Sequence, residues 1–399
     1  MATILFDQPK TRSQLFPLTF TRPVSEIRIG ILTISDKWKK SLNTDISWLT
    51  EPYLESKYPF KPENDNLYIN GCLCPNLDIL TEIKTLPTET ALFKQNKLLA
   101  FRSKKSVSFK QIETFINDLK RKDYSNEVTL IERPWHVFLN NGSQIREDIK
   151  FFNHLSEHKL NDPHTRIYHP ENIYIEQGAV VKAAILNAEY GPIYLGKNTE
   201  IKEGAMIRGP FALCNDSVVN MGAKLIGDNT IGPYCKVGGE ISNTVIQGFS
   251  NKSHDGFLGN SVIGEWCNIG ADTNTSNLKN NYTKVKLWDY TSEKFEDTGL
   301  QFCGLIMGDH AKCGINTMFN TGTVVGVGAN VFGEGFPSNY IPSFTWGGAK
   351  GFSTFKFDKF VDMTKTVMGR RQKDLDKSEL AILEAIYLLT AKHRFWETK

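Results

Sequence analysis

The chain has 399 residues, a formal net charge of +3 and 23% charged residues. This nearly balanced charge argues against a dedicated nucleic-acid surface or an acidic tail. The seven cysteines are an odd number, and we expect them to be buried, reduced thiols of a cytoplasmic protein. We find neither a secretory signal nor a stretch apolar and long enough to predict a membrane span.

The glycines divide the chain into two parts. Only three of the 31 glycines precede residue 160, so the two parts are expected to differ in architecture. A chain of this length lets each part bury a core of its own. We predict domain boundaries at 1–155, 156–350 and 351–399, the last range being a C-terminal extension with a helix.

Residues 1–155 alternate between strand and helix signals. Strands are expected at 3–6, 66–70 and 91–101, and helices at 27–40, 77–85 and 109–121. This alternation predicts an α/β domain with a mostly parallel sheet. The polar segment 148–166 is expected to form a linker and a capping helix.

Branched aliphatic residues recur every six positions in the second part of the chain: Leu195, Ile201, Ile207, Leu213, Val219, Leu225, Ile231 and Val237. A helical face recurs at three and four residues, so this period excludes an amphipathic helix. A period of six predicts a β-helix in which 18 residues close one triangular coil and the aliphatic side chains point inward.

The same six-residue step continues on both sides of this run. We expect further inward positions upstream at Ile173, Ala179 and Ile185, and downstream at Phe257, Ile263, Ile269, Met307, Cys313, Phe319, Val325 and Val331. At the far end, Asp376 precedes the apolar run 380–389, which predicts a capped helix. Such a helix would close the open edge of the last coil.

Two polar stretches, 250–259 and 268–277, interrupt the aliphatic columns. They hold His254, a group able to take a proton at neutral pH, and several amides able to hold a carbonyl oxygen. Alternatives stay open: His254 as a surface-turn residue, and Asn268 and Asn274 as a structural ladder. A zinc site of His254 and His310 across a trimer interface is a further alternative, although no third ligand is evident.

The motif His254-x-x-Phe257-Leu258-Gly259 and the later Asn268 and Asn277 form a pattern without a gap. The pattern resembles the acetyltransferase domain of bifunctional N-acetylglucosamine-1-phosphate uridyltransferases/glucosamine-1-phosphate acetyltransferases. The resemblance implies that His254 is the general base that deprotonates the substrate amine for attack on acetyl-CoA.

The same resemblance implies binding roles for other residues. Asn268 and Asn277 would contact the sugar and the acetyl donor, and Lys236 would replace a phosphate-binding arginine without its bidentate geometry. Lys252 and Phe257 complete the expected set of substrate- and acetyl-CoA-binding residues.

The chain departs from the family pattern in three places. Phe257 stands where the family has tyrosine, Ser242 stands where it has a phosphate-binding lysine, and the insert 278–305 is longer. These departures favour another acceptor or weakened chemistry on the same scaffold.

Residues 11–19, followed by Arg22-Pro23, resemble the signature loop of sugar nucleotidyltransferases. In that signature, glycines let backbone amides approach the nucleotide phosphates and acids bind Mg²⁺. Here no glycine precedes Gly30, and Val24 takes the place of the signature lysine. The resemblance implies nucleotide binding by Arg12 as the first candidate. Lys10, Arg22 and Asp7 are the next candidates. The alternative is an ordinary strand, loop and helix.

We therefore predict an α/β nucleotidyltransferase-like domain followed by a left-handed parallel β-helix and a terminal helix. The expected function is acyl transfer from acetyl-CoA to a sugar phosphate or sugar nucleotide. A Mg²⁺-dependent nucleotidyl transfer from a nucleoside triphosphate to a sugar 1-phosphate is expected beside it. The expected assembly is a homotrimer without nucleic acid or membrane partners and without a resident metal in the β-helix. The alternative is a non-catalytic trimeric scaffold or sensor that binds a nucleotide or sugar nucleotide.

Overall fold

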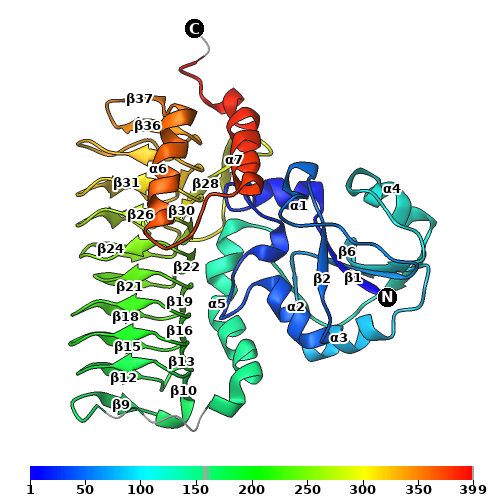
Figure 1. Cartoon of the computed structure of the whole chain (residues 1–399), viewed down its shortest axis with the longest axis horizontal. Helices are drawn as coiled ribbons and strands as arrows, with labels where there is room; N and C mark the ends of the chain where they lie inside the picture. The colour runs from blue at the N-terminus through cyan, green and yellow to red at the C-terminus, as the bar shows by residue number, and fades with distance from the viewer. Residues whose placement is uncertain (156–159, 161, 398–399) are drawn as a thin grey trace.

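The computed structural model describes residues 1–155, 160 and 162–397. An α/β part stands beside a β-helix whose coils are stacked along its whole length (Figure 1). The expected linker 148–166 and the boundary at 155 fall partly on residues 156–159 and 161, which lie outside the described residues. The predicted domain boundaries stay a prediction.

The α/β part is built on a six-stranded sheet. Only the antiparallel pairings of β6 break its parallel order, which confirms the mostly parallel sheet. The order across the sheet is β2 (Ile46–Leu49), β1 (Ala2–Phe6), β3 (Asn66–Asn70), β6 (Lys97–Ser103), β5 (Thr90–Lys94) and β7 (Lys120–Asp123). A short antiparallel pair, β4 (Leu73–Cys74) and β8 (Thr129–Leu130), lies outside it.

The helices of this part are α1 (Pro9–Gln14), α2 (Ile34–Leu42), α3 (Leu77–Lys84), α4 (Ile112–Phe115) and α5 (Pro134–Asp148). The expected helix 27–40 begins late, because an antiparallel bridge joins Arg28 to Thr33 and the Thr33 side chain then caps α2. The expected helix 109–121 is broken into short turns, and its last residues form the edge strand β7. The described part of the expected capping helix forms the 3₁₀ helix Ile149–Leu155, and α5 before it was not expected from the sequence.

The β-helix has three faces. A nine-stranded sheet contains β10 (Ile173–Ile175), β13 (Ile193–Leu195), β16 (Phe211–Leu213), β19 (Asn229–Ile231), β22 (Val245–Gly248), β25 (Val262–Glu265), β30 (Leu305–Met307), β33 (Thr323–Val325) and β35 (Tyr340–Ile341). A ten-stranded sheet contains β11 (Val180–Val181), β14 (Glu200–Ile201), β17 (Val218–Val219), β20 (Lys236–Val237), β23 (Asn251–Lys252), β26 (Asn268–Ile269), β31 (Lys312–Cys313), β34 (Asn330–Val331), β36 (Thr345–Gly348) and β37 (Gly351–Thr354).

The third face is a six-stranded sheet of β9 (Arg166–Tyr168), β12 (Ile185–Asn187), β15 (Met206–Arg208), β18 (Lys224–Ile226), β21 (Glu240–Ser242) and β24 (Phe257–Gly259). The pair β27 (Asn274–Thr275) and β32 (Met318–Phe319) lies further along the chain. Within the three faces all pairings but the last, between β36 and β37, are parallel. The left-handed parallel β-helix expected from the repeats is confirmed.

The six-residue period reflects the three faces, because Leu195, Ile201 and Ile207 are buried residues of one strand on each face. Leu195, Leu213 and Ile231 lie above one another in successive coils, and all three side chains are fully buried. Two of the expected positions are wrong by one residue. Leu186, not the exposed Ile185, points inward, and Leu258, not Phe257, pairs with the buried Ile241.

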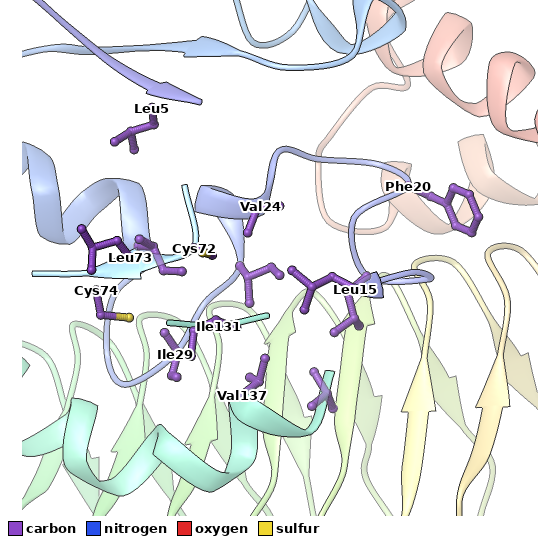
Figure 2. Close-up of a cluster of buried hydrophobic side chains, with 14 of the residues drawn as sticks. Leu5, Leu15, Phe20, Val24, Ile29, Cys72, Leu73, Cys74, Ile131 and Val137 are labelled. Carbon is purple, nitrogen blue, oxygen red and sulfur yellow. The ribbon is translucent and has the colours of Figure 1, made fainter. Parts of the chain in front are cut away.

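The α/β part and the β-helix share one buried cluster. Figure 2 shows Leu15, Ile131 and Val137 of the α/β part above the strands of the β-helix. The same cluster includes Val245 and Val262 of the nine-stranded sheet. Helix α5 lies between the two parts and contacts β16, β19, β22 and β25 (Figure 1).

The insert 278–305 forms a hairpin of β28 (Lys286–Asp289) and β29 (Lys294–Asp297). The ring of Tyr290, at its tip, packs edge-on against Phe16 and Phe20, with centroids 5.8 and 5.4 Å away. The insert therefore contacts the chain's own α/β part, a role that the sequence leaves open.

Two helices follow the β-helix, α6 (Phe357–Gly369) and α7 (Lys377–Leu389). The Asp376 side chain accepts a hydrogen bond from Glu379 N at 2.8 Å, which confirms the capped helix. Both helices stand beside the coils, whereas the expected helix would lie across the end (Figure 1). Phe360 of α6 packs against Phe344 and His310 on the side of the β-helix, and α7 contacts the turn Pro52–Leu54 of the α/β part. Among the described residues, no helix has the length and apolar character to cross a bilayer.

Candidate functional site

An outward column of the ten-stranded sheet carries polar and basic side chains. Lys236, Asn251 and Asn268 follow one another in register, one to a coil. Lys312 pairs with Asn268 in the next coil. Because adjacent strands are about 4.8 Å apart, these side chains form a continuous row along the sheet. All four line a cavity of about 610 Å³ that His254 also lines.

The predicted base lies in an exposed turn between β23 and β24. The His254 ring has no hydrogen-bond partner among the residues that the structure describes. Gly256 follows with a φ of +114°, and a Cβ there would meet Thr273 O at 2.1 Å, so only glycine fits this turn. An imidazole without a partner in a cavity is free to hydrogen-bond a bound ligand.

Lys252, expected to bind substrate, instead occupies an inward position. It pairs with Val237, is only 2% exposed, and its ammonium group donates to His254 O at 2.8 Å and to Gly238 O at 3.3 Å. Burial lowers the pKa of Lys252 to about 8. The side chain therefore holds the His254 turn from inside the coil.

The two remaining expected residues lie around a neighbouring corner. The Phe257 ring and the Asn277 amide both lie against Gly259, and Asn277 donates to Asn260 Oδ1 at 2.8 Å. Neither residue lines the cavity of His254. The structure thus brings His254, Asn268 and Lys236 together and leaves Phe257 and Asn277 outside.

The two asparagines for which a ladder was the alternative differ. Asn274 Oδ1 accepts from Phe257 N at 2.8 Å, and its amide donates to Asp272 O at 3.1 Å, so Asn274 braces two turns. Asn268 is exposed beside Asn251, and its side chain has no hydrogen-bond partner within the described ranges. Asn268 therefore keeps its amide available to a ligand.

One turn of the β-helix carries a column of stacked rings. Tyr234, Phe249, Trp266 and His310 all adopt positive φ, and neighbouring rings are nearly parallel, with centroids 4.9, 4.3 and 6.3 Å apart. Phe249 and Trp266 give the cavity an aromatic wall. Burial lowers the pKa of His310 to about 3, so its ring is neutral in this stack.

Three basic residues of the cavity were missed by the sequence reading: Lys312, Arg370 and Arg371. The long insert lies between Asn268 and Lys312, so the spacing of the two residues in the sequence does not show that they pair. The arginines follow α6, and nothing in the sequence shows that α6 returns to this face. Arg371 donates to Asn251 Oδ1 at 3.1 Å, which fixes the end of α6 on the cavity.

The signature-like loop of the α/β part holds a buried ion pair. Arg12 donates to Asp7 Oδ2 at 3.1 Å, to Arg22 O at 2.8 Å and to the Tyr53 hydroxyl at 2.8 Å. Asp7 also accepts from Thr50 Oγ1 and from Val24 N, so both of its oxygens are occupied. These residues do not fit a Mg²⁺ ligand set as they are arranged here.

Lys10 and Arg22, the other two expected nucleotide ligands, face different surroundings. Lys10 lines a second cavity of about 630 Å³, together with Lys97, Arg133 and Trp135. Arg22 is 5% exposed and is paired with Asp309 and Glu265 of the β-helix. Elsewhere in the described chain, no three His, Cys, Asp or Glu side chains gather as a metal-binding group.

Comparison with known proteins adds a family match for the α/β part. Residues 3–156 match the family model described as sugar nucleotidyl transferase, which is less than half of the chain. This match supports a transferase related to sugar nucleotides, without fixing which group is transferred. A search of curated proteins finds no match to the sequence.

Several solved structures are similar to parts of the chain. The polySia specific acetyltransferase NeuO is 16% identical with a TM-score of 0.27, covering 49% of this chain and 85% of its own. The Arabidopsis UDP-N-acetylglucosamine acyltransferase is 16% identical with a TM-score of 0.25, covering 54% and 80%. A point mutant of AntD, an N-acyltransferase from Bacillus cereus in complex with dTDP and coenzyme A, is 12% identical with a TM-score of 0.21, covering 56% and 97%.

Proposed function

We propose that the β-helix cavity transfers an acetyl group from acetyl-CoA to an amine or hydroxyl of a sugar phosphate or sugar nucleotide. The observation that carries this proposal is the shared cavity of His254, Asn268 and Lys236. In the proposed step the acceptor nitrogen or oxygen attacks the thioester carbonyl and His254 takes the acceptor's proton. The C–S bond then breaks, and His254 returns the proton to the sulfur, so that the coenzyme leaves as the thiol. In this proposal the Asn268 amide orients a carbonyl or hydroxyl oxygen.

The test is thiol release from acetyl-CoA with a panel of amino-sugar phosphates and sugar nucleotides. His254→Ala should reduce turnover by about 10²- to 10⁴-fold if His254 is the base. His164→Gln, at an exposed position outside the cavity, serves as the control and should keep full turnover. A loss below threefold in a folded His254→Ala variant removes the proposed role.

A second candidate function is nucleotidyl transfer in the α/β part. The family match over residues 3–156 and the cavity of Lys10, Lys97 and Arg133 favour it. Its test is release of pyrophosphate from UTP or dTTP in the presence of sugar 1-phosphates. Lys10→Met should abolish that release, and unchanged release would exclude Lys10 from the nucleotide site.

The alternative of a non-catalytic scaffold or sensor predicts ligand binding without turnover. Thermal stabilisation by acetyl-CoA, nucleoside triphosphates or sugar nucleotides measures binding directly, because a ligand of the folded state raises the unfolding temperature. Stabilisation without thiol or pyrophosphate release would favour the scaffold. The homotrimer stays a prediction, to be checked by light scattering.

A further inference from the structure

We propose that Lys312, Arg370 and Arg371 form a subsite for a phosphate or diphosphate group within the cavity of His254. The inference rests on the proposed function for its ligand, since both a sugar phosphate and coenzyme A carry such groups. The subsite lies where the two arginines that follow α6 meet the column of Asn268.

The first argument is a surplus of positive charge. The cavity is lined by Lys236, Lys312, Arg370 and Arg371, and no aspartate or glutamate lines it among the described residues. Cations gathered in a concave site without counter-charges attract an anion. This electrostatic pattern distinguishes the cavity from the second one, which Glu113 and Glu132 also line.

The second argument concerns the surroundings of Lys312. Its ammonium group donates to His310 O at 3.1 Å and Trp266 O at 3.4 Å, both neutral backbone groups. Burial lowers the pKa of Lys312 to about 8, because no carboxylate offsets the loss of water. A bound anion would supply the missing counter-charge and leave the lysine fully protonated.

The third argument is that the Arg371 side chain is held in place. Arg370 and Arg371 follow the C-terminal end of α6, where the partial negative charge of the helix favours cations. Arg371 is tied to Asn251 Oδ1, and its backbone N donates to Met368 O at 2.8 Å. An arginine fixed in this way can bind phosphate oxygens through paired N–H groups at low entropic cost.

The position of the subsite suits the proposed reaction. Lys312 is one coil from Asn268, so a phosphate bound there lies roughly 5 Å along the column from the amide. Phe249 and Trp266 line the same cavity. A cavity of about 610 Å³ is of the size that holds a small phosphorylated ligand.

The test is calorimetric titration of the full chain with inorganic pyrophosphate and with inorganic phosphate. Lys312→Met and Arg371→Met should each weaken pyrophosphate binding at least about tenfold, the loss of one charge-assisted contact. Lys365→Met is the matched control, because Lys365 is exposed on the same helix and does not line the cavity. Equal affinity in all variants, or no binding by the wild-type protein, would overturn the subsite.

Competition then identifies the source of the phosphate. Displacement of pyrophosphate by coenzyme A would assign the subsite to the donor, and displacement by a sugar 1-phosphate alone would assign it to the acceptor. Both results support the subsite. Because binding is measured without turnover, a protein that binds pyrophosphate and releases no thiol keeps the subsite and loses the acyltransferase proposal. Turnover with unchanged KM values in Lys312→Met would support the acyltransferase proposal and contradict the subsite.

Discussion

Arg22 and Asp309 form a buried ion pair that joins the signature-like loop of the α/β part to the β-helix, 287 residues further along the chain. Thr21 Oγ1 donates to the same carboxylate at 2.6 Å, and Glu265 lies 3.3 Å from the arginine. Residues next to these acids, Trp266 and His310, supply the carbonyls that hold Lys312. The loop therefore supports one wall of the β-helix cavity.

Replacing Arg22 by methionine should destabilise the whole chain. The change leaves Asp309 as a buried carboxylate without its cation, which typically costs about 3–5 kcal/mol. Urea denaturation measures the loss in the free energy of unfolding. Lys39→Met, which breaks the exposed pair with Asp45, should leave that free energy unchanged. A similar result for both variants would mean that the buried pair does not hold the two parts together.

His310 should make the protein sensitive to acid. Its pKa is lowered to about 3 by burial, whereas an unfolded histidine titrates near 6.5, so the folded state keeps the ring neutral. This stability is present above pH 6.5 and is lost as the pH falls toward 3, at about 1.4 kcal/mol per unit. The charged groups around the ring are Lys312, Glu265, Lys57 and Arg22.

His310→Phe keeps an aromatic ring in the stack and removes the titration. Between pH 7.5 and 4.5 the wild-type protein should lose about 2.5 kcal/mol more unfolding free energy than this variant. Urea denaturation at the two pH values measures the difference, with His164→Gln as the control for loss of an exposed histidine. Parallel losses in wild type and His310→Phe would show that another group governs acid sensitivity.

The fold could be predicted where the signal is local. The six-residue period follows from the three faces of a coil, because each hexapeptide contributes one buried residue, as Leu195, Ile201 and Ile207 do. The phase fails at Ile185, because the inward residues Val181 and Leu186 are five residues apart, whereas their partners Ile201 and Ile207 are six apart. The sequence did not predict helix α5, because its buried face includes the polar residues Asn141 and Gln144. A helix without a continuous apolar stripe gives no clear helical period.

The site could be predicted only in part for related reasons. His254 and Asn268 lie within one coil of each other, so a motif in the sequence keeps them together. Lys312 and Arg371 reach the cavity through the long insert and through α6, and such tertiary contacts leave no local pattern. Lys252 has the residue type of a ligand, but its place in the inward column is visible only from the register.

Tyr290 should anchor the insert to the α/β part. Its ring is buried between Phe20 of the loop and Tyr340 of the β-helix, with centroids 5.4 and 5.6 Å away. Tyr290→Ala should cost about 3–5 kcal/mol, the usual range for removing a buried aromatic ring. Urea denaturation measures this, and Tyr282→Ala, at a 65% exposed ring of the same insert, should cost far less. Equal losses would contradict an anchoring role.

Lys252→Met separates positioning of His254 from packing. Methionine suits the aliphatic column beside Val237, and replacing a buried charge by an apolar side chain often keeps or raises stability. The variant loses the hydrogen bond to His254 O, so kcat for acyl transfer should fall about tenfold or more while the unfolding free energy at pH 7 is maintained. The imidazole signals of His254 in NMR spectra should shift as its turn relaxes. Lys224→Met, at an outward position of another face, is the control. Unchanged kcat and unchanged imidazole signals in Lys252→Met would show that the ammonium group only fills the coil.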